Sequence, residues 1–194
     1  MGKKKHKKKE KIKPSKIPSY YRISCAYHES GHAIASLCVG ALFDYILVRK
    51  RYTGHCDGEV TYPNGSRVFP INRAIICYCG GIADHKYRNT IAPRSSGGVD
   101  ADQAFEQINY LHDILLGVRG YHKCRWNLEN EILLTSQKLV DDNWDQIDFL
   151  AKYILKNKKK MYYYEVIRLL LENNMYDSLV TPPRIKLEPG VCKE

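Results

Sequence analysis

The chain has 194 residues, of which 44% are hydrophobic and 27% are charged, enough for one domain with a real hydrophobic core. Its net charge is +10, but nine lysines and one glutamate in residues 1–16 supply +8 of it, so the remainder is nearly neutral. The basicity therefore gives no support to a nucleic-acid-binding domain, and no apolar stretch reaches the roughly 20 residues of a membrane-spanning helix.

The first segment, residues 1–18, is predicted to be a disordered lysine-rich arm, because blocks of like charge do not fold by themselves. Such an arm could contact nucleic acid or an anionic surface through counterion release. It could equally be a solubilising tail with no fixed partner. The lysines are not followed by an apolar segment, so the sequence does not read as a secretory signal.

The second segment, residues 19–175, is predicted to be the folded domain, and it begins with a helix over residues 20–39. This helix carries the sequence AYHESGHA, with His28 and His32 four residues apart. Residues at i and i+4 lie on one face of a helix, so both imidazoles can reach a single Zn²⁺. Glu29 lies beside them and is predicted to be the general base that takes a proton from the zinc-bound water. The competing interpretation is a pair of satisfied core histidines.

A catalytic zinc site uses three protein ligands, so a third is expected elsewhere in the chain. The candidates are His55, Asp57, Asp84, His85, Asp100, Asp102 and His112. The strongest are Asp100 and Asp102, which follow a loop of small residues and open a predicted helix. Asp84 or His85 could instead orient a ligating histidine from behind, with a surface position as an equal alternative.

The remaining elements follow from hydrophobic periodicity and turn residues. They are a strand-loop-strand region at 45–62, helices at 71–86, 100–118, 127–141, 143–155 and 162–173, a solvent-facing basic turn at 156–160, and an irregular tail at 176–194. The predicted fold class is mainly α with a small β-sheet (α+β).

Seven cysteines lie at positions 25, 38, 56, 77, 79, 124 and 192, without a Cys-x-x-Cys pair. Cys77 and Cys79 fall in an apolar run and are predicted to be core thiols, since free cysteine is among the most buried residue types. An odd number of cysteines without a signal peptide indicates a reducing compartment, so a cytoplasmic location is expected.

From residue 20 to residue 172 the chain resembles the peptidase domain of the FtsH-type ATP-dependent zinc proteases. That family carries Ala-Tyr-His-Glu-Ala-Gly-His-Ala at its zinc helix, and this chain differs there only at Ser30. The family's Gly-Val-Thr strand is similar to residues 58–61, its Gly-Gly-Arg segment to residues 80–85, and its Thr-Thr-Gly-Ala-x-x-Asp loop to residues 95–100. The resemblance implies a zinc-helix metallopeptidase domain with His28, His32 and a loop aspartate as ligands.

Two alignments of that aspartate remain open. Counting from the glycine loop selects Asp102, whereas aligning the following helix selects Asp100, with Ala104, Ile108 and Leu111 on its inner face. We favour Asp100, because packing over several turns holds helix register while loops tolerate a deletion.

The chain contains no Gly-x-x-x-x-Gly-Lys-Ser/Thr segment, so the phosphate-binding loop of an ATPase is absent from these residues. We therefore expect a zinc metalloendopeptidase that cleaves unfolded or flexible protein segments, with a separate ATPase partner where substrates are folded. Residues 58–62 resemble the family's active-site edge strand, which would hold an extended peptide. The alternative is a catalytically silent, zinc-stabilised interaction module that recruits a partner through its basic arm.

Overall fold

The computed structural model describes residues 19–50, 56–63, 68–90, 99–117, 124–157, 160–183 and 185. In chain order the elements are α1 (Ser19–Cys38), β1 (Tyr45–Lys50), β2 (Cys56–Thr61), α2 (Pro70–Tyr87), α3 (Val99–Leu116), α4 (Arg125–Asp142), α5 (Trp144–Asn157), β3 (Lys160–Tyr162) and α6 (Tyr163–Glu172). The described residues thus form a mainly helical structure with a small β-sheet, and the predicted α+β class is confirmed.

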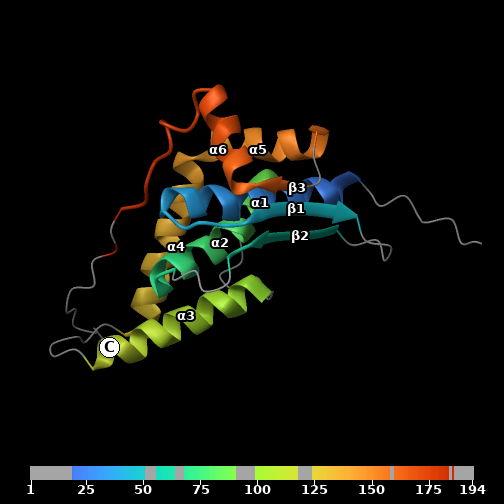
Figure 1. Ribbon diagram of the computed structural model, residues 1–194. Helices are drawn as coiled ribbons and strands as arrows, with labels where there is room; N and C mark the ends of the chain where they lie inside the picture. Colours follow the sequence, from blue (N-terminus) through green and yellow to red (C-terminus); the bar gives the residue numbers. More distant parts are fainter. Residues whose placement is uncertain are drawn as a thin grey trace, which may run out of the picture.

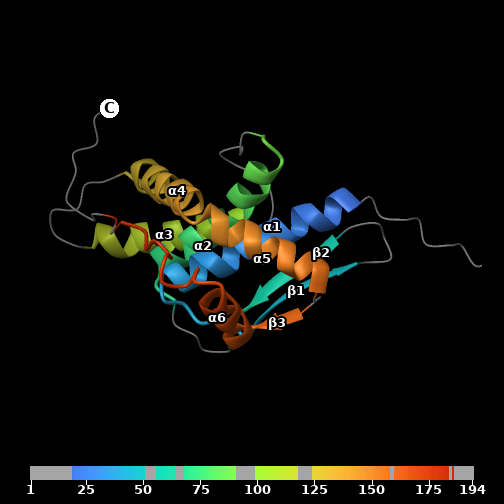
Figure 2. The ribbon, with the colours of Figure 1, turned by 90° about the horizontal axis from the view of Figure 1, so that it is seen from above.

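Helix α1 runs through the middle of the fold (Figures 1 and 2). It packs against α2 and α5, and also against β1 and β2. Its apolar residues are accordingly buried on several sides, and Ala26, Ala33 and Ile34 have no exposed surface. The ring of Tyr27 stacks on Tyr87 of α2 at a centroid distance of 4.2 Å, which ties the two helices together. The helix that carries the histidine motif is therefore held firmly by its neighbours.

The sheet is antiparallel, with strand order β2-β1-β3. The central strand β1 buries alternate residues, Ile46 and Val48, as expected of a strand with one face on the core. Ile46 pairs with Val60 on one side and with Met161 on the other. Strand β2 lies at one edge of this sheet and contacts α1, so an edge strand runs beside the histidine helix.

Helices α2, α3 and α4 form the other side of the core. α2 packs on α1, and α3 lies against α2 and α4 at the lower edge of the view in Figure 1. The inner face of α3 agrees with the predicted register, because Ala104 and Ile108 are fully buried and Leu111 packs on the core. The other predicted helices were found within about two residues of their expected bounds, the usual uncertainty at helix ends.

Strand β3 was not predicted. Lys156 and Lys160 are exposed, as expected for the basic turn, but Lys160 opens a three-residue strand rather than ending a turn. In the tail, residues 176–183 form neither helix nor strand, as expected of an irregular segment. They are nevertheless attached to the domain, because the buried Asn143 accepts a hydrogen bond from Val180 N (2.8 Å) and donates one to Val180 O (2.9 Å). This pairing attaches the tail to the α4–α5 junction.

The prediction of core thiols is confirmed for Cys77 and Cys79, which are buried and unpaired with other cysteines. Burial raises the pKa of Cys77 to about 11, so this thiol stays protonated and unreactive at neutral pH.

Among the described helices, none combines the length and the apolar character that crossing a bilayer requires.

Candidate metal centre

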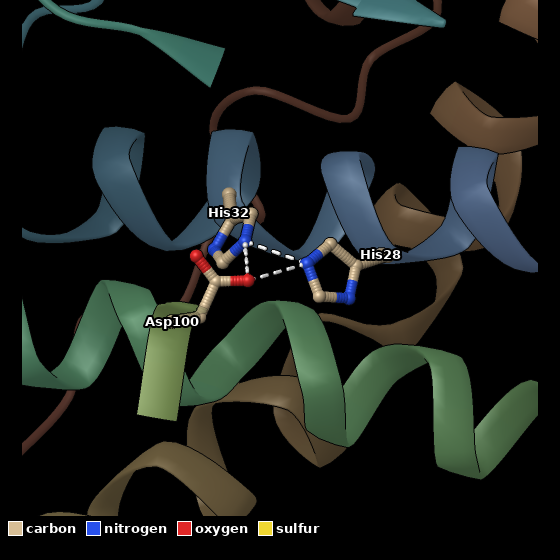
Figure 3. Close-up of side chains that lie close together, drawn as sticks. All are labelled: His28, His32 and Asp100. Atoms are coloured by element: carbon tan, nitrogen blue, oxygen red, sulfur yellow. Dashed lines mark hydrogen bonds and ion pairs between the residues drawn. The ribbon is translucent and has the colours of Figure 1, made fainter. Parts of the chain in front are cut away.

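His28 and His32 lie one helical turn apart on α1 and face the same direction (Figure 3). Their Nε2 atoms are 3.0 Å apart, and the rings meet edge to face at 86° with centroids 4.6 Å apart. This is the arrangement that the i, i+4 spacing predicts. His32 is buried, whereas His28 is partly exposed and borders an opening.

Asp100, at the start of α3, completes the cluster from 72 residues away in the chain. Its Oδ2 lies 2.8 Å from Nε2 of His28 and 3.4 Å from Nε2 of His32, and Figure 3 shows the resulting triangle of ligand-type atoms. Among the described His, Cys, Asp and Glu side chains, these three lie close enough together to hold a metal ion. Asp102 is exposed and lies outside the cluster, so Asp100 is the one of the two aspartates that lies with the histidines.

The chemistry and dimensions of this cluster fit zinc. Tetrahedral coordination with bonds of about 2.0–2.1 Å separates ligand atoms by about 3.3 Å, and the three edges here are 2.8, 3.0 and 3.4 Å. Nδ1 of His32 lies 2.8 Å from the carbonyl oxygen of Ile76. A carbonyl can only accept, so Nδ1 carries the hydrogen and Nε2 of the neutral ring presents a lone pair to the cluster.

Electrostatics within the cluster favour a charged carboxylate. Burial acts to raise the pKa of Asp100, but hydrogen bonds to His28 and His32 outweigh it and hold that pKa well below its usual range. Burial acts to lower the pKa of His32, but its hydrogen bond with Asp100 and the negative charges of Asp100 and Glu29 raise it overall. Two imidazoles and an ionised carboxylate therefore converge on a point where a cation is stabilised.

Glu29 lines the same pocket as the three ligand-type residues, but it is only 5% exposed. Burial raises its pKa, and the nearby His32 and His28 partly offset that rise. Its carboxylate lies against the backbone of β2 at Gly58, where an added Cβ would come within 2.4 Å of Oε1. Only glycine at position 58 lets the edge strand approach the carboxylate this closely.

Helix α2 supports the site without contributing a ligand. A Cβ on Gly80 would lie 2.4 Å from Cε1 and Nε2 of His32, so the missing side chain leaves the room that the imidazole occupies. A Cβ on Gly31 of α1 would lie 2.6 Å from the carbonyl oxygen of Cys79. The two glycines allow α1 and α2 to approach closely enough for Ile76 O to bind His32.

The pocket around the cluster has a volume of about 380 Å³. Its wall comes from α1, β2, α2 and the start of α3, in the residues His28, Glu29, His32, Gly58, Glu59, Val60, Tyr62, Arg73, Ile76, Cys77, Val99, Asp100 and Gln103. The edge strand β2 thus forms one side of an opening that leads to the three ligand-type atoms.

The other sequence candidates lie elsewhere. Asp84 accepts hydrogen bonds from Ser24 and from Arg88, and His85 pairs with Thr90 at 2.9 Å, so neither orients a cluster histidine, and that prediction is wrong. His112 lies 3.9 Å from Asp113 and is not part of the cluster. His55 and the side chain of Asp57 fall outside the described residues.

Sequence reasoning missed the group that does orient His32, the backbone carbonyl of Ile76, because a carbonyl leaves no mark in the sequence. It also missed Arg73 of α2 in the pocket wall, whereas Tyr62 falls in the segment 58–62 that was expected beside the site. The Gly80-Gly81 pair inside a helical pattern was a usable signal, since a glycine at such a position indicates close packing.

A search of known protein-family models and of curated protein sequences finds no match to this chain.

Proposed function

We propose that this protein is a zinc-dependent metalloendopeptidase that resembles the FtsH-type peptidase domain. The observation that carries the proposal is the meeting of His28, His32 and Asp100 around one point, with Glu29 in the same pocket. The His-Glu-x-x-His spacing supplies the first two and the glutamate. Asp100 arrives from a different helix, which a pair of core histidines would not require.

A zinc ion held by these three residues would polarise a scissile carbonyl and make water acidic near neutral pH. Glu29 accepts the proton of the attacking water as the new carbon–oxygen bond forms. It then delivers that proton to the amine nitrogen as the carbon–nitrogen bond breaks. Ile76 keeps His32 in the tautomer that presents Nε2, and Gly80 leaves the space for its ring.

The pocket geometry favours an extended, unfolded substrate. Strand β2 lies at the edge of the described sheet and forms one wall of the pocket. An extended peptide can pair with such an edge through its backbone, which selects for chain conformation more than for side chains. A folded substrate would first have to be opened, and a separate ATPase chain is the partner we propose for that step.

The test is cleavage of a permanently unfolded protein by zinc-loaded protein without ATP, comparing wild type with Glu29→Gln. Glu172→Gln is the matched control, because Glu172 is exposed at the end of α6, far along the chain from the pocket residues. We expect cleavage by wild type and Glu172→Gln, none by Glu29→Gln, and about one zinc per chain in all three.

Two results would contradict the proposal in different ways. Zinc binding by all three proteins without cleavage by any would favour the interaction module, with Glu29 as a structural residue. Cleavage that survives removal of zinc by a chelator, or that survives Glu29→Gln, would assign any activity to another site or to a contaminant.

A further inference from the structure

The wall of the metal-site pocket includes an arginine that has no carboxylate partner among the described residues. Arg73 of α2 lines the pocket together with the ligand-type residues. Its guanidinium carbon lies 4.3 Å from the ring centroid of Tyr62. The pocket wall has three acidic residues. Asp100 pairs with the histidines, Glu59 accepts a hydrogen bond from the hydroxyl of Tyr45 (2.9 Å), and Glu29 is buried against β2 at Gly58. Arg73 therefore lines this opening without an ion-pair partner among the described residues.

The arginine is held in position by a chain of contacts that begins at the metal site. The hydroxyl of Ser36 donates to the carbonyl oxygen of His32 (2.7 Å), which uses its single hydrogen. The hydroxyl of Tyr62, 2.8 Å from Ser36 Oγ, is then the donor of that second bond. Burial raises the pKa of Tyr62 to about 12, so the phenol stays protonated. Its ring supports the flat face of Arg73, which leaves the in-plane N–H groups free for a planar anion.

The position of Arg73 on α2 suits contact with a substrate residue close to the cleaved bond. Arg73 lies one helical turn before Ile76, whose carbonyl binds His32, so the two positions are about 4.5 Å apart along the α2 axis. Extended peptide advances about 3.3 Å per residue. Strand β2 follows the same direction along α1, from Gly58 beside Glu29 to Tyr62 beside Ser36. A peptide paired with β2 therefore passes Arg73 within one or two residues of the cluster.

We propose that Arg73 is a specificity-determining residue that binds a carboxylate of the peptide substrate one or two residues from the cleaved bond. The inference rests on the proposed peptidase function. The carboxylate can belong to an Asp or Glu side chain inside the peptide or to its free C-terminus. The guanidinium fork binds either group through two parallel hydrogen bonds. Selection for the first source makes the enzyme an endopeptidase that prefers acidic residues, and selection for the second makes it prefer chain ends.

The test uses unstructured peptides of Gly, Ser and Leu whose cleavage site has been located by mass spectrometry. A single Glu or Gln is placed at each of the two positions on either side of the cleaved bond. A second pair ends one or two residues after the cleaved bond, in a free carboxylate or an amide. The readouts are kcat/KM for the zinc-loaded protein and Kd for peptide binding to the zinc-loaded Glu29→Gln protein, which holds the peptide uncleaved.

At one position we expect the carboxylate peptide to be cleaved and bound about tenfold better than its neutral twin, the range of a charge-assisted hydrogen bond. Arg73→Gln should remove this ratio, so that the carboxylate peptide and its neutral twin are cleaved and bound alike. Arg73→Glu should prefer a Lys peptide at that position. Arg168→Gln, an exposed arginine of α6, is the control that should keep the wild-type ratio.

Equal kcat/KM and Kd for the two peptides in wild type, or a preference that persists in Arg73→Gln, would overturn the inference. The binding measurement separates this failure from failure of the proposed function. If no peptide is cleaved, the Glu or Gln is moved along the peptide and binding alone is measured. Tighter binding of a carboxylate peptide by the Glu29→Gln protein that is lost in the Glu29→Gln, Arg73→Gln double variant would leave the anion site standing while the peptidase assignment falls.

Discussion

Replacing Gly80 with alanine should weaken zinc binding although Gly80 is not a ligand. The new Cβ would lie 2.4 Å from Nε2 and Cε1 of His32, whereas ordinary contacts begin near 3.4 Å. The imidazole must therefore move by about 1 Å. It has little freedom to do so, because Nδ1 is held by Ile76 O at 2.8 Å and His32 is only 7% exposed.

The expected magnitude is that of losing a group that orients a ligand, a decrease in zinc affinity of about 10- to 100-fold. The helix itself should tolerate the change. Gly80 lies in the interior of α2, where alanine is favoured over glycine by about 1 kcal/mol. We therefore expect the metal-free variant to unfold within a few degrees of wild type, so the defect should be confined to the site.

The assay is competition for zinc against a chromophoric chelator, together with thermal unfolding of the metal-free protein. Gly117→Ala is the matched control, because a Cβ there meets only the carbonyl oxygen of Ile114, at 3.3 Å. Unchanged zinc affinity in a folded Gly80→Ala protein would refute the argument that this glycine makes room for the ligand. Loss of the fold would refute the claim that the clash falls on the ring rather than on the backbone.

Three further substitutions test the site and the helix that carries it. Asp100→Asn should lower zinc affinity by more than about 10-fold, and Asp102→Asn should leave it unchanged, because only the first of these two aspartates lies with the histidines. Competition with a chelator measures the zinc affinity of both variants. A larger loss in Asp102→Asn would identify Asp102 as the ligand. Ser30→Ala should raise the free energy of unfolding by about 1 kcal/mol, which corresponds to a melting temperature higher by about 2–4 °C. The reason is that the Ser30 hydroxyl is fully buried without a hydrogen-bond partner among the described residues. A lower melting temperature would show that the hydroxyl has a partner.

The parts of the site that could be predicted from sequence are those set by local geometry. His28, Glu29 and His32 are placed by helix periodicity alone, because four residues make about one turn. Asp100 was predicted through the register of the helix that follows it, and the burial of Ala104 and Ile108 agrees with that register. In both cases a repeating pattern along one helix carried the information.

What could not be predicted depends on contacts between distant segments. Strand β3 is three residues long and exists because Met161 pairs with Ile46, far away in sequence. Asp84 was a reasonable candidate for orienting a histidine, but Arg88 lies one turn further along the same helix and pairs with it instead. The sequence shows which residues can form a contact, but not which of several competing contacts the packing selects.

Helix α2 illustrates why a motif search finds only half of such a site. It donates no metal-ligand side chain, yet Ile76 O fixes the tautomer of His32 and Gly80 leaves room for its ring. Arg73 and Gly80, seven residues apart, lie on one face of this helix, so the packing that secures the ligand also aims the guanidinium into the pocket. A change that tilts α2 should therefore alter zinc affinity and carboxylate preference together, whereas Arg73→Gln should abolish the preference without changing zinc affinity, because Arg73 is not one of the three ligand-type residues.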